Sequence, residues 1–181
     1  STRKSIELKP DLAKAHLNLG IILKDLDKLK EAEISTRRAI ELKPDFADAH
    51  SNLGNILKDL DKLKEAEIST RKAIELKPDF ANAHFNLGNT LRDLGKLQEA
   101  VISYHKAIEL KPDFTDAYFN LSLTELLQGN YQSGLENYEF RFKKKDPVLL
   151  HGNPTIRKID TIDLTLTKGD KLLVVTEQGL G

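Results

Sequence analysis

The chain has 181 residues, and its 28 basic residues balance 28 acidic ones. This zero balance gives no electrostatic argument for binding nucleic acid or an anionic membrane surface. The absence of cysteine excludes disulfides and thiolate metal sites, and no apolar run reaches the ~20 residues of a membrane-spanning helix. No signal peptide is visible, so we expect a cytoplasmic location. Because the chain begins at Ser1 and lacks methionine, we expect it to be a piece of a longer protein.

One short motif returns along the chain at a fixed interval. The sequence IELKPDF occupies 40–46, 74–80 and 108–114, and a variant ending in leucine occupies 6–12. Successive copies lie 34 residues apart, and a fixed period of this length indicates a repeat array. The frame predicts a partial repeat at 1–12, repeats at 13–46, 47–80 and 81–114, and a divergent repeat at 115–148.

The repeat at 47–80 illustrates the two helices expected in each block. Apolar or small residues recur at helical spacing in both halves of it. The segment DLDKL at 59–63 interrupts this pattern and separates the two helices. The apolar or small residues of the two helices are Ala49, Leu53, Gly54, Ile56, Leu57, Leu60, Leu63, Ala66, Ile68, Ala73, Ile74 and Leu76.

The Lys-Pro-Asp motif is expected to end one helix pair and to begin the next. Proline disfavours helical geometry at the residue before it, so Pro78 should end the second helix of this repeat. Asp45 is the expected N-cap of the first helix, with Asp48 adding favourable charge in the first turn. By the same argument, we expect residues 1–9 to form a separate second helix that lacks its own first helix.

Three glycines lie inside the predicted first helices, where glycine costs about 1 kcal/mol relative to alanine. Such a cost suggests that a neighbouring helix approaches closely at these positions. The glycines are Gly20, Gly54 and Gly88, and the alanines expected to face them are Ala32, Ala66 and Ala100. Stacked helix pairs bury apolar faces that a single pair leaves open, and they generate a superhelix with a concave groove.

The repeats resemble the tetratricopeptide repeat family. The matching residues are the NLG tripeptides at 18–20, 52–54 and 86–88, the alanines Ala32, Ala66, Ala100, Ala39, Ala73 and Ala107, and the prolines Pro44, Pro78 and Pro112. The resemblance covers roughly 1–148 and implies an all-α helix-turn-helix superhelix, or solenoid. The repeat at 115–148 departs from the pattern at Ser122, Gly134, Arg141 and Pro147, so we expect the tail, rather than a fifth helix pair, to contact it.

The first helices of such an array line its concave face, and an asparagine ladder runs along them. Its members are Asn18, Asn52, Asn86 and Asn120. An asparagine amide both donates and accepts hydrogen bonds, which suits it to hold the backbone of an extended peptide. The alternative is that near-identical repeats copy every residue, useful or not. The other candidate peptide-binding residues are Asn55, Asn89, Lys24, Lys58, Arg92, Asp25, Asp59 and Asp93.

Three histidines, His16, His50 and His84, recur early in the first helices, and Tyr118 takes the fourth position. Equivalent positions in neighbouring repeats lie at least about 8–10 Å apart, so these side chains cannot converge on one metal ion at ~2.1 Å. We expect them to pack against the paired helix. We expect no catalytic residue, metal or cofactor within the repeats.

The composition changes after Val148. The segment 161–167 alternates as a short strand does, 171–176 has the pattern of a buried strand, and a Gly-rich loop follows. Many nucleotide-binding α/β domains begin in this way, so we interpret 149–181 as a linker and the first strand of a truncated α/β domain. The segment 138–181 resembles bacterial proteins in which tetratricopeptide repeats precede a glycosyltransferase-like domain, similar in layout to O-linked N-acetylglucosamine transferase.

Three functional hypotheses follow. The first is a non-catalytic scaffold whose concave groove holds an extended segment of a protein or peptide. The alternative, implied by the resemblance of the tail, is the substrate-recruiting arm of a bacterial glycosyltransferase-like enzyme whose catalytic domain is absent from this sequence. A structural or self-assembling array is a third hypothesis. We expect protein or peptide partners rather than nucleic acid or membrane, and self-association through the exposed N-terminal helix or the C-terminal strand.

Overall fold

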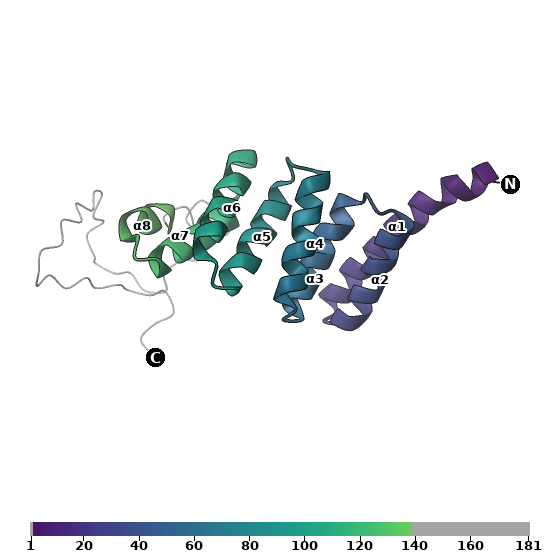
Figure 1. Cartoon of the computed structure of the whole chain (residues 1–181), viewed down its shortest axis with the longest axis horizontal. Helices are drawn as coiled ribbons and strands as arrows, with labels where there is room; N and C mark the ends of the chain where they lie inside the picture. The colour runs from purple at the N-terminus through teal and green to yellow at the C-terminus, as the bar shows by residue number, and fades with distance from the viewer. Residues whose placement is uncertain (1, 139–181) are drawn as a thin grey trace, which may run out of the picture.

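The computed structural model describes residues 2–138, which form eight α-helices in four antiparallel pairs (Figure 1). The pairs are α1 (Thr2–Asp25) with α2 (Leu29–Leu42), α3 (Ala47–Asp59) with α4 (Leu63–Leu76), α5 (Ala81–Asp93) with α6 (Leu97–Leu110), and α7 (Thr115–Leu127) with α8 (Tyr131–Tyr138). This arrangement confirms the all-α solenoid. The interpretations of the tail at 149–181, including its β-type remnant, lie outside the described residues, as do Arg141 and Pro147.

Each pair is closed by a tight turn that contains one residue in the left-handed conformation. In the first two pairs this residue is an aspartate, Asp27 or Asp61, with φ of 58° and 60°. Short polar side chains such as aspartate tolerate this conformation better than other non-glycine residues. The backbone N–H of Lys62 then donates to the carbonyl oxygen of Leu57 at 2.8 Å, which closes the turn. The break predicted at DLDKL is therefore confirmed.

The turn between pairs is organised by phenylalanine rather than by aspartate. Helices α2, α4 and α6 end two residues before a proline, as predicted. However, the N-cap of α3 is Phe46, which makes no side-chain capping bond, so the prediction of Asp45 as the cap is wrong. The Phe46 ring packs against buried Leu17 and Ala39 and lies 5.1 Å from the Lys43 ammonium. This packing anchors the turn and leaves Asp45 exposed.

The first Lys-Pro-Asp motif does not end a helix. Helix α1 runs without interruption from Thr2 to Asp25, through Pro10, so the prediction of a separate helix at 1–9 is wrong. At the later motifs, the helix before the proline packs on the first helix of its own pair, and the turn is held between two packed pairs. The Lys-Pro-Asp motif by itself therefore does not fix a turn.

The pairs stack so that first helices lie closer together than second helices. Helix α1 contacts α3, α3 contacts α5, and α5 contacts α7. Within residues 2–138, no such contact joins the second helices of successive pairs. The first helices therefore lie on the inner, concave side of the stack, as the repeat frame predicts, and Figure 1 shows the pairs following one another in a row.

The glycines inside the first helices allow the second helix of the same pair to approach closely. This contact was expected, because glycine in a helix interior is unfavourable relative to alanine. A Cβ atom on Gly54 would overlap the Thr70 hydroxyl and lie 3.2 Å from the Ala66 carbonyl oxygen. A Cβ on Gly88 would lie 2.5 Å from the ring of Tyr104. The predicted close approach is confirmed, although a threonine or tyrosine side chain, together with the alanine backbone, forms the contact.

One apolar residue of the repeat at 47–80 lies outside the core. Ile68 on α4 is 71% exposed, whereas its neighbours Ser69 and Thr70 are buried. The two buried hydroxyls are satisfied, because Ser69 donates to the His50 carbonyl oxygen at 3.0 Å and Thr70 to that of Ala66 at 2.8 Å. Small hydroxyl side chains thus fill the narrow space between the helices of a pair, and the larger isoleucine lies on the outer surface.

An ion-pair network links the second helices on that outer surface. The Arg37 guanidinium contacts Glu33 on its own helix at 2.9 Å and Glu65 on α4 at 3.0 Å. Lys62 reaches back to Glu33 at 2.8 Å. The equivalent set in the next pair is Glu67, Arg71, Lys96 and Glu99. Because these pairs connect helices that are not in backbone contact, they help to fix the spacing of successive repeats.

Candidate peptide-binding groove

The concave side carries a groove of about 670 Å³ formed by α1, α3, α5 and the turns beside them. Four of the predicted site residues, Asn18, Asn52, Asn55 and Asn86, line it. Apolar contact area comes from Leu17, Ile21, Phe46 and Phe80. The groove therefore combines amides that can bond a main chain with small apolar patches that can receive side chains, the mixture expected of a ligand site.

Each of three ladder asparagines donates a hydrogen bond to a side chain of the preceding repeat. The Nδ2 of Asn52 donates to the Thr36 hydroxyl and that of Asn86 to the Ser51 hydroxyl, both at 3.3 Å. The Nδ2 of Asn120 donates to Asn89 Oδ1 at 2.7 Å. These three asparagines are half-buried, whereas Asn18 is exposed. An amide has two N–H donors and one carbonyl acceptor, so each retains a donor and an acceptor for another partner.

The predicted rows of basic and acidic residues are partly joined to each other. Lys24 contacts Asp59 of the next repeat at 3.1 Å, and Lys58 contacts the same carboxylate at 2.8 Å. Burial raises the pKa of the Asp59 carboxyl, but hydrogen bonds from Lys58 and Lys24 outweigh this effect and hold the pKa below its usual value. These contacts favour a structural role for Lys24, Lys58 and Asp59, which link two repeats, over a role in ligand binding.

The other charged residues of these two rows make different contacts in different repeats. Arg92 contacts its neighbour Asp93 at 3.2 Å, within one repeat. Asp25 lies exposed on α1. In the sequence these residues are spaced evenly with Lys24 and Asp59. Among the charged residues of the two rows, however, the ion pair between repeats is that of Lys24 with Asp59. Evenly spaced residues therefore do not make the same contacts in every repeat.

Tyr104 is a site-forming residue that the sequence reading missed. It occupies the frame position of Thr36 and Thr70, is fully buried, and donates from its hydroxyl to Asn89 Oδ1 at 2.8 Å. The same Asn89 oxygen accepts the bond from Asn120. Two donors therefore hold the orientation of the Asn89 amide. Burial raises the pKa of Tyr104 well above its usual value, so the hydroxyl remains a donor at ordinary pH.

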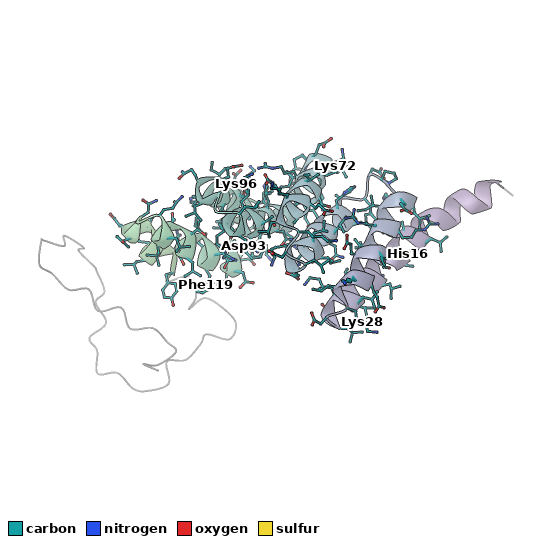
Figure 2. All side chains as sticks on the ribbon, turned by 60° about the horizontal axis from the view of Figure 1, so that its bottom comes forward. His16, Lys28, Lys72, Asp93, Lys96 and Phe119 are labelled. Carbon is teal, nitrogen blue, oxygen red and sulfur yellow. The ribbon has the colours of Figure 1, made fainter. Side chains whose placement is uncertain are left out.

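The inner face becomes aromatic toward the C-terminal repeats. Ser51 in the second full repeat is replaced in the frame by Phe85 and then by Phe119. The Phe85 ring lies 4.8 Å from that of Phe114, and the Phe119 ring lies 5.8 Å from that of Tyr138. Phe119 lies at the opposite end of the array from His16 (Figure 2). The sequence shows both phenylalanines, but the regular repeat frame gave no reason to single out this position.

The histidines are held by the turns that precede their helices. A ring nitrogen, Nε2, of His50 lies 2.9 Å from the Pro44 carbonyl oxygen, and that of His84 lies 2.9 Å from the Pro78 carbonyl oxygen. The prediction that these rings pack on the paired helix therefore misses one contact. Each of the two rings also contacts the turn that precedes its helix. In the part of the chain that the structure describes, no group of three or more acidic or histidine side chains is placed to hold a metal ion.

Stacked helix pairs with an amide-lined inner groove define an α-solenoid scaffold. The chain belongs to the tetratricopeptide repeat family, whose models match residues 13–46, 47–80 and 81–114. The described residues form an array of these repeats, which is a non-catalytic, protein-binding fold. No helix among them combines the length and apolar character that a bilayer span requires.

Solved structures with the same fold include three informative cases. MamA shares 25% sequence identity with a TM-score of 0.67, over 76% of this chain and 81% of MamA. A mutant O-GlcNAc transferase of Thermobaculum terrenum shares 27% identity with a TM-score of 0.63, over 65% of this chain but only 22% of the enzyme. The first tetratricopeptide unit of Spaghetti (RPAP3), bound to an HSP90 peptide, shares 22% identity with a TM-score of 0.64, over 66% and 94%. No curated protein sequence matches the chain.

Proposed function

We propose that this chain is a scaffold that holds an extended segment of a partner protein along its concave groove. The observation that carries the proposal is the hydrogen bonding of the asparagine ladder. Asn52 and Asn86 each use one N–H to bond the preceding repeat, which leaves a carbonyl oxygen and a second N–H for a ligand. An extended peptide presents N–H and C=O groups along its whole length, whatever its sequence, so such amides suit its main chain.

The fixed orientation of the amides supports tight binding. A side chain that is already held in place loses little conformational freedom when it binds a ligand, and this lowers the free-energy cost of association. Asn52 and Asn86, which line the groove, are oriented by their bonds to Thr36 and Ser51.

Side-chain preference of the ligand follows from the mixed lining of the groove. Lys14 and Asn55 contribute polar groups, and Leu17, Ile21 and Phe80 contribute apolar surface. The ligand that fits best is an extended segment that combines polar side chains with apolar ones. The RPAP3 unit, which has the same fold, is a precedent for peptide binding.

Selection from a random peptide display library tests the proposal. The immobilised 181-residue chain is expected to enrich linear peptides that combine polar with apolar side chains. The same library on a variant carrying Asn52→Ala and Asn86→Ala is expected to lose most of this enrichment. Equal enrichment on both proteins would assign the ladder to repeat copying, and failure to enrich any linear peptide would contradict the groove function itself.

A second candidate is the substrate-recruiting arm of a glycosyltransferase-like enzyme. The similarity to the Thermobaculum terrenum O-GlcNAc transferase favours it, although the match spans 22% of that enzyme. The full natural reading frame distinguishes this role from that of a free scaffold. An α/β-type region of roughly 200 residues after Gly181 would support the enzyme arm, whereas a stop codon shortly after Gly181 would contradict it.

A further inference from the structure

The ladder asparagines of the groove are separated by the distance between neighbouring first helices. Asn18, Asn52 and Asn86 line the same groove, and each holds the same frame position on its own helix. Their helices α1, α3 and α5 lie side by side, with Cα atoms that approach within 8 Å of each other. Helices in contact have axes about 8–10 Å apart, so successive ladder amides are separated by a similar distance.

This spacing decides how many ligand residues separate two ladder contacts. An extended chain advances about 3.3 Å per residue, so two residues span about 7 Å and fall short of the spacing. Three residues span about 10 Å and match it. A ligand segment that lies along the ladder therefore meets one asparagine at every third residue.

A contact at every third residue disfavours a regular β-strand along the ladder. Successive residues of a strand face opposite sides, so residues three apart present their main-chain groups in opposite directions. A polyproline II helix has three residues per turn and a rise of about 3.1 Å, so residues three apart face the same side at a distance of about 9 Å. This helix has no internal hydrogen bonds, which leaves its N–H and C=O groups free to bond the asparagines.

The aromatic residues of the groove follow the same spacing. Phe46 and Phe80 line it one repeat apart, and both side chains are half-buried. Proline-rich segments in the polyproline II conformation bind aromatic-lined grooves in several unrelated domains. The two phenylalanines therefore offer apolar contact area to proline rings that lie between the ladder contacts.

We propose, on the basis of the peptide-binding function proposed above, that the groove selects a proline-rich segment in the polyproline II conformation. Ligand residues at relative positions 1, 4 and 7 each exchange main-chain hydrogen bonds with one of Asn18, Asn52 and Asn86. Asn52 and Asn86 each use one N–H to bond the preceding repeat. Their second N–H donates to a ligand C=O, and their carbonyl oxygen accepts from a ligand N–H.

Proline is excluded from some positions of such a ligand and favoured at others. The residues that bond the ladder need an N–H, which proline lacks. The intervening residues make no such bond, and proline there sets the backbone angle φ at about −65°, close to the polyproline II value. A ligand that already holds its bound conformation loses less conformational entropy on binding. The preferred segment therefore has a non-proline residue at every third position, with prolines between them.

The first test compares two acetylated peptides of identical composition by calorimetric titration of the 181-residue chain. One is (Ala-Pro-Pro)5, which has an N–H at every third residue. The other has its alanines at positions 1–3 and 12–13 and prolines elsewhere, so no two alanines are three residues apart. We expect the first peptide to bind about tenfold more tightly, the effect of one or two more hydrogen bonds. Equal affinity, including no binding by either, would overturn the proposal, whereas the library selection would still decide whether the groove binds peptides.

The second test locates the contacts with the tightest peptide from that library selection. Each non-proline residue in turn receives an N-methyl group, which removes its main-chain N–H. Affinity measured by fluorescence anisotropy should fall about tenfold at positions three residues apart, and little elsewhere. In the variant Asn52→Ala, methylation of the middle position should have no further effect, while the control Asn130→Ala should keep the native pattern. Loss at every second position, or a pattern without a period of three, would overturn the proposal.

Discussion

The Tyr104 hydroxyl donates a 2.8 Å hydrogen bond to Asn89 Oδ1, the oxygen that also accepts from Asn120. These three residues belong to α6, α5 and α7, so one acceptor joins two successive repeats. In the preceding repeats a threonine stands in place of the tyrosine. Thr36 accepts from Asn52 of the next repeat, whereas Thr70 donates to the Ala66 carbonyl oxygen of its own helix.

Replacement of Tyr104 by phenylalanine should destabilise the fold by about 1 kcal/mol, the typical net contribution of a buried hydrogen bond. The ring and its packing on Gly88 remain, so only the hydroxyl is lost. Urea unfolding followed by circular dichroism measures the change. The matched control, Tyr131→Phe, alters a tyrosine that is 59% exposed and should be neutral. Equal stability of both variants would show that the Tyr104–Asn89 bond contributes nothing.

Replacement of Gly54 by alanine should lower stability, although alanine favours helix by about 1 kcal/mol. The new Cβ overlaps the Thr70 hydroxyl, and overpacking of a core costs about 1–3 kcal/mol. Addition of Thr70→Ala removes the overlapping oxygen, so the double variant should be more stable than the sum of the single changes indicates. Thermal unfolding of the four proteins in this cycle gives the coupling, and strict additivity would contradict the clash.

The double variant Asn52→Ala, Asn86→Ala should bind a selected groove peptide at least tenfold more weakly, as measured by fluorescence anisotropy. The loss of about 1.4 kcal/mol corresponds to one or two main-chain hydrogen bonds. Stability should fall by no more than about 1 kcal/mol, because the bonds to Thr36 and Ser51 are long and half-buried. The control Asn130→Ala changes an exposed asparagine in the last turn. Native affinity in the double variant would remove the ladder from the binding site.

Acid should weaken the stacking of repeats through Glu33 and Glu67. Burial raises the pKa of Glu33, but hydrogen bonds from Lys62 and Arg37 outweigh it and leave the pKa below its usual value of 4.5. The hydrogen bond from Lys96 is the main cause of the lowered pKa of Glu67. A carboxylate with a depressed pKa in the folded state stabilises the fold above its unfolded pKa, and this contribution disappears as the pH falls through the folded value.

The melting temperature of the native chain should therefore drop as the pH falls below about 4.5. The double variant Glu33→Gln, Glu67→Gln should melt lower at neutral pH and show a shallower decline with acid. Glu31→Gln, which alters an exposed partner of Lys28 at 4.0 Å, serves as the control and should follow the native curve. If the double variant and the native chain gave parallel curves, the two glutamates would have no special part in acid sensitivity.

Several local features of the chain could be predicted from the sequence. The turn at 59–63 and the ends of α2, α4 and α6 follow from the backbone chemistry of a few residues. Proline disfavours helical geometry at the residue before it, and a helical period places apolar residues on one face. The close contact at Gly54 could also be predicted. Glycine in a helix interior is less stable than alanine, and a closely packed neighbour explains its presence there. The four-pair solenoid follows from repetition of these local rules at a fixed interval.

Other features depend on which neighbour each repeat meets. Nearly the same residues surround Pro10 and Pro44, yet the first lies inside a helix and the second in a turn that is held between packed pairs. Ile68 and Leu53 have similar hydropathy, yet one is exposed and the other buried, since each position faces a different surface of the stack. The partners of Asn52 likewise come from another repeat. Contacts across repeats are set by three-dimensional proximity, and a one-dimensional period cannot specify them.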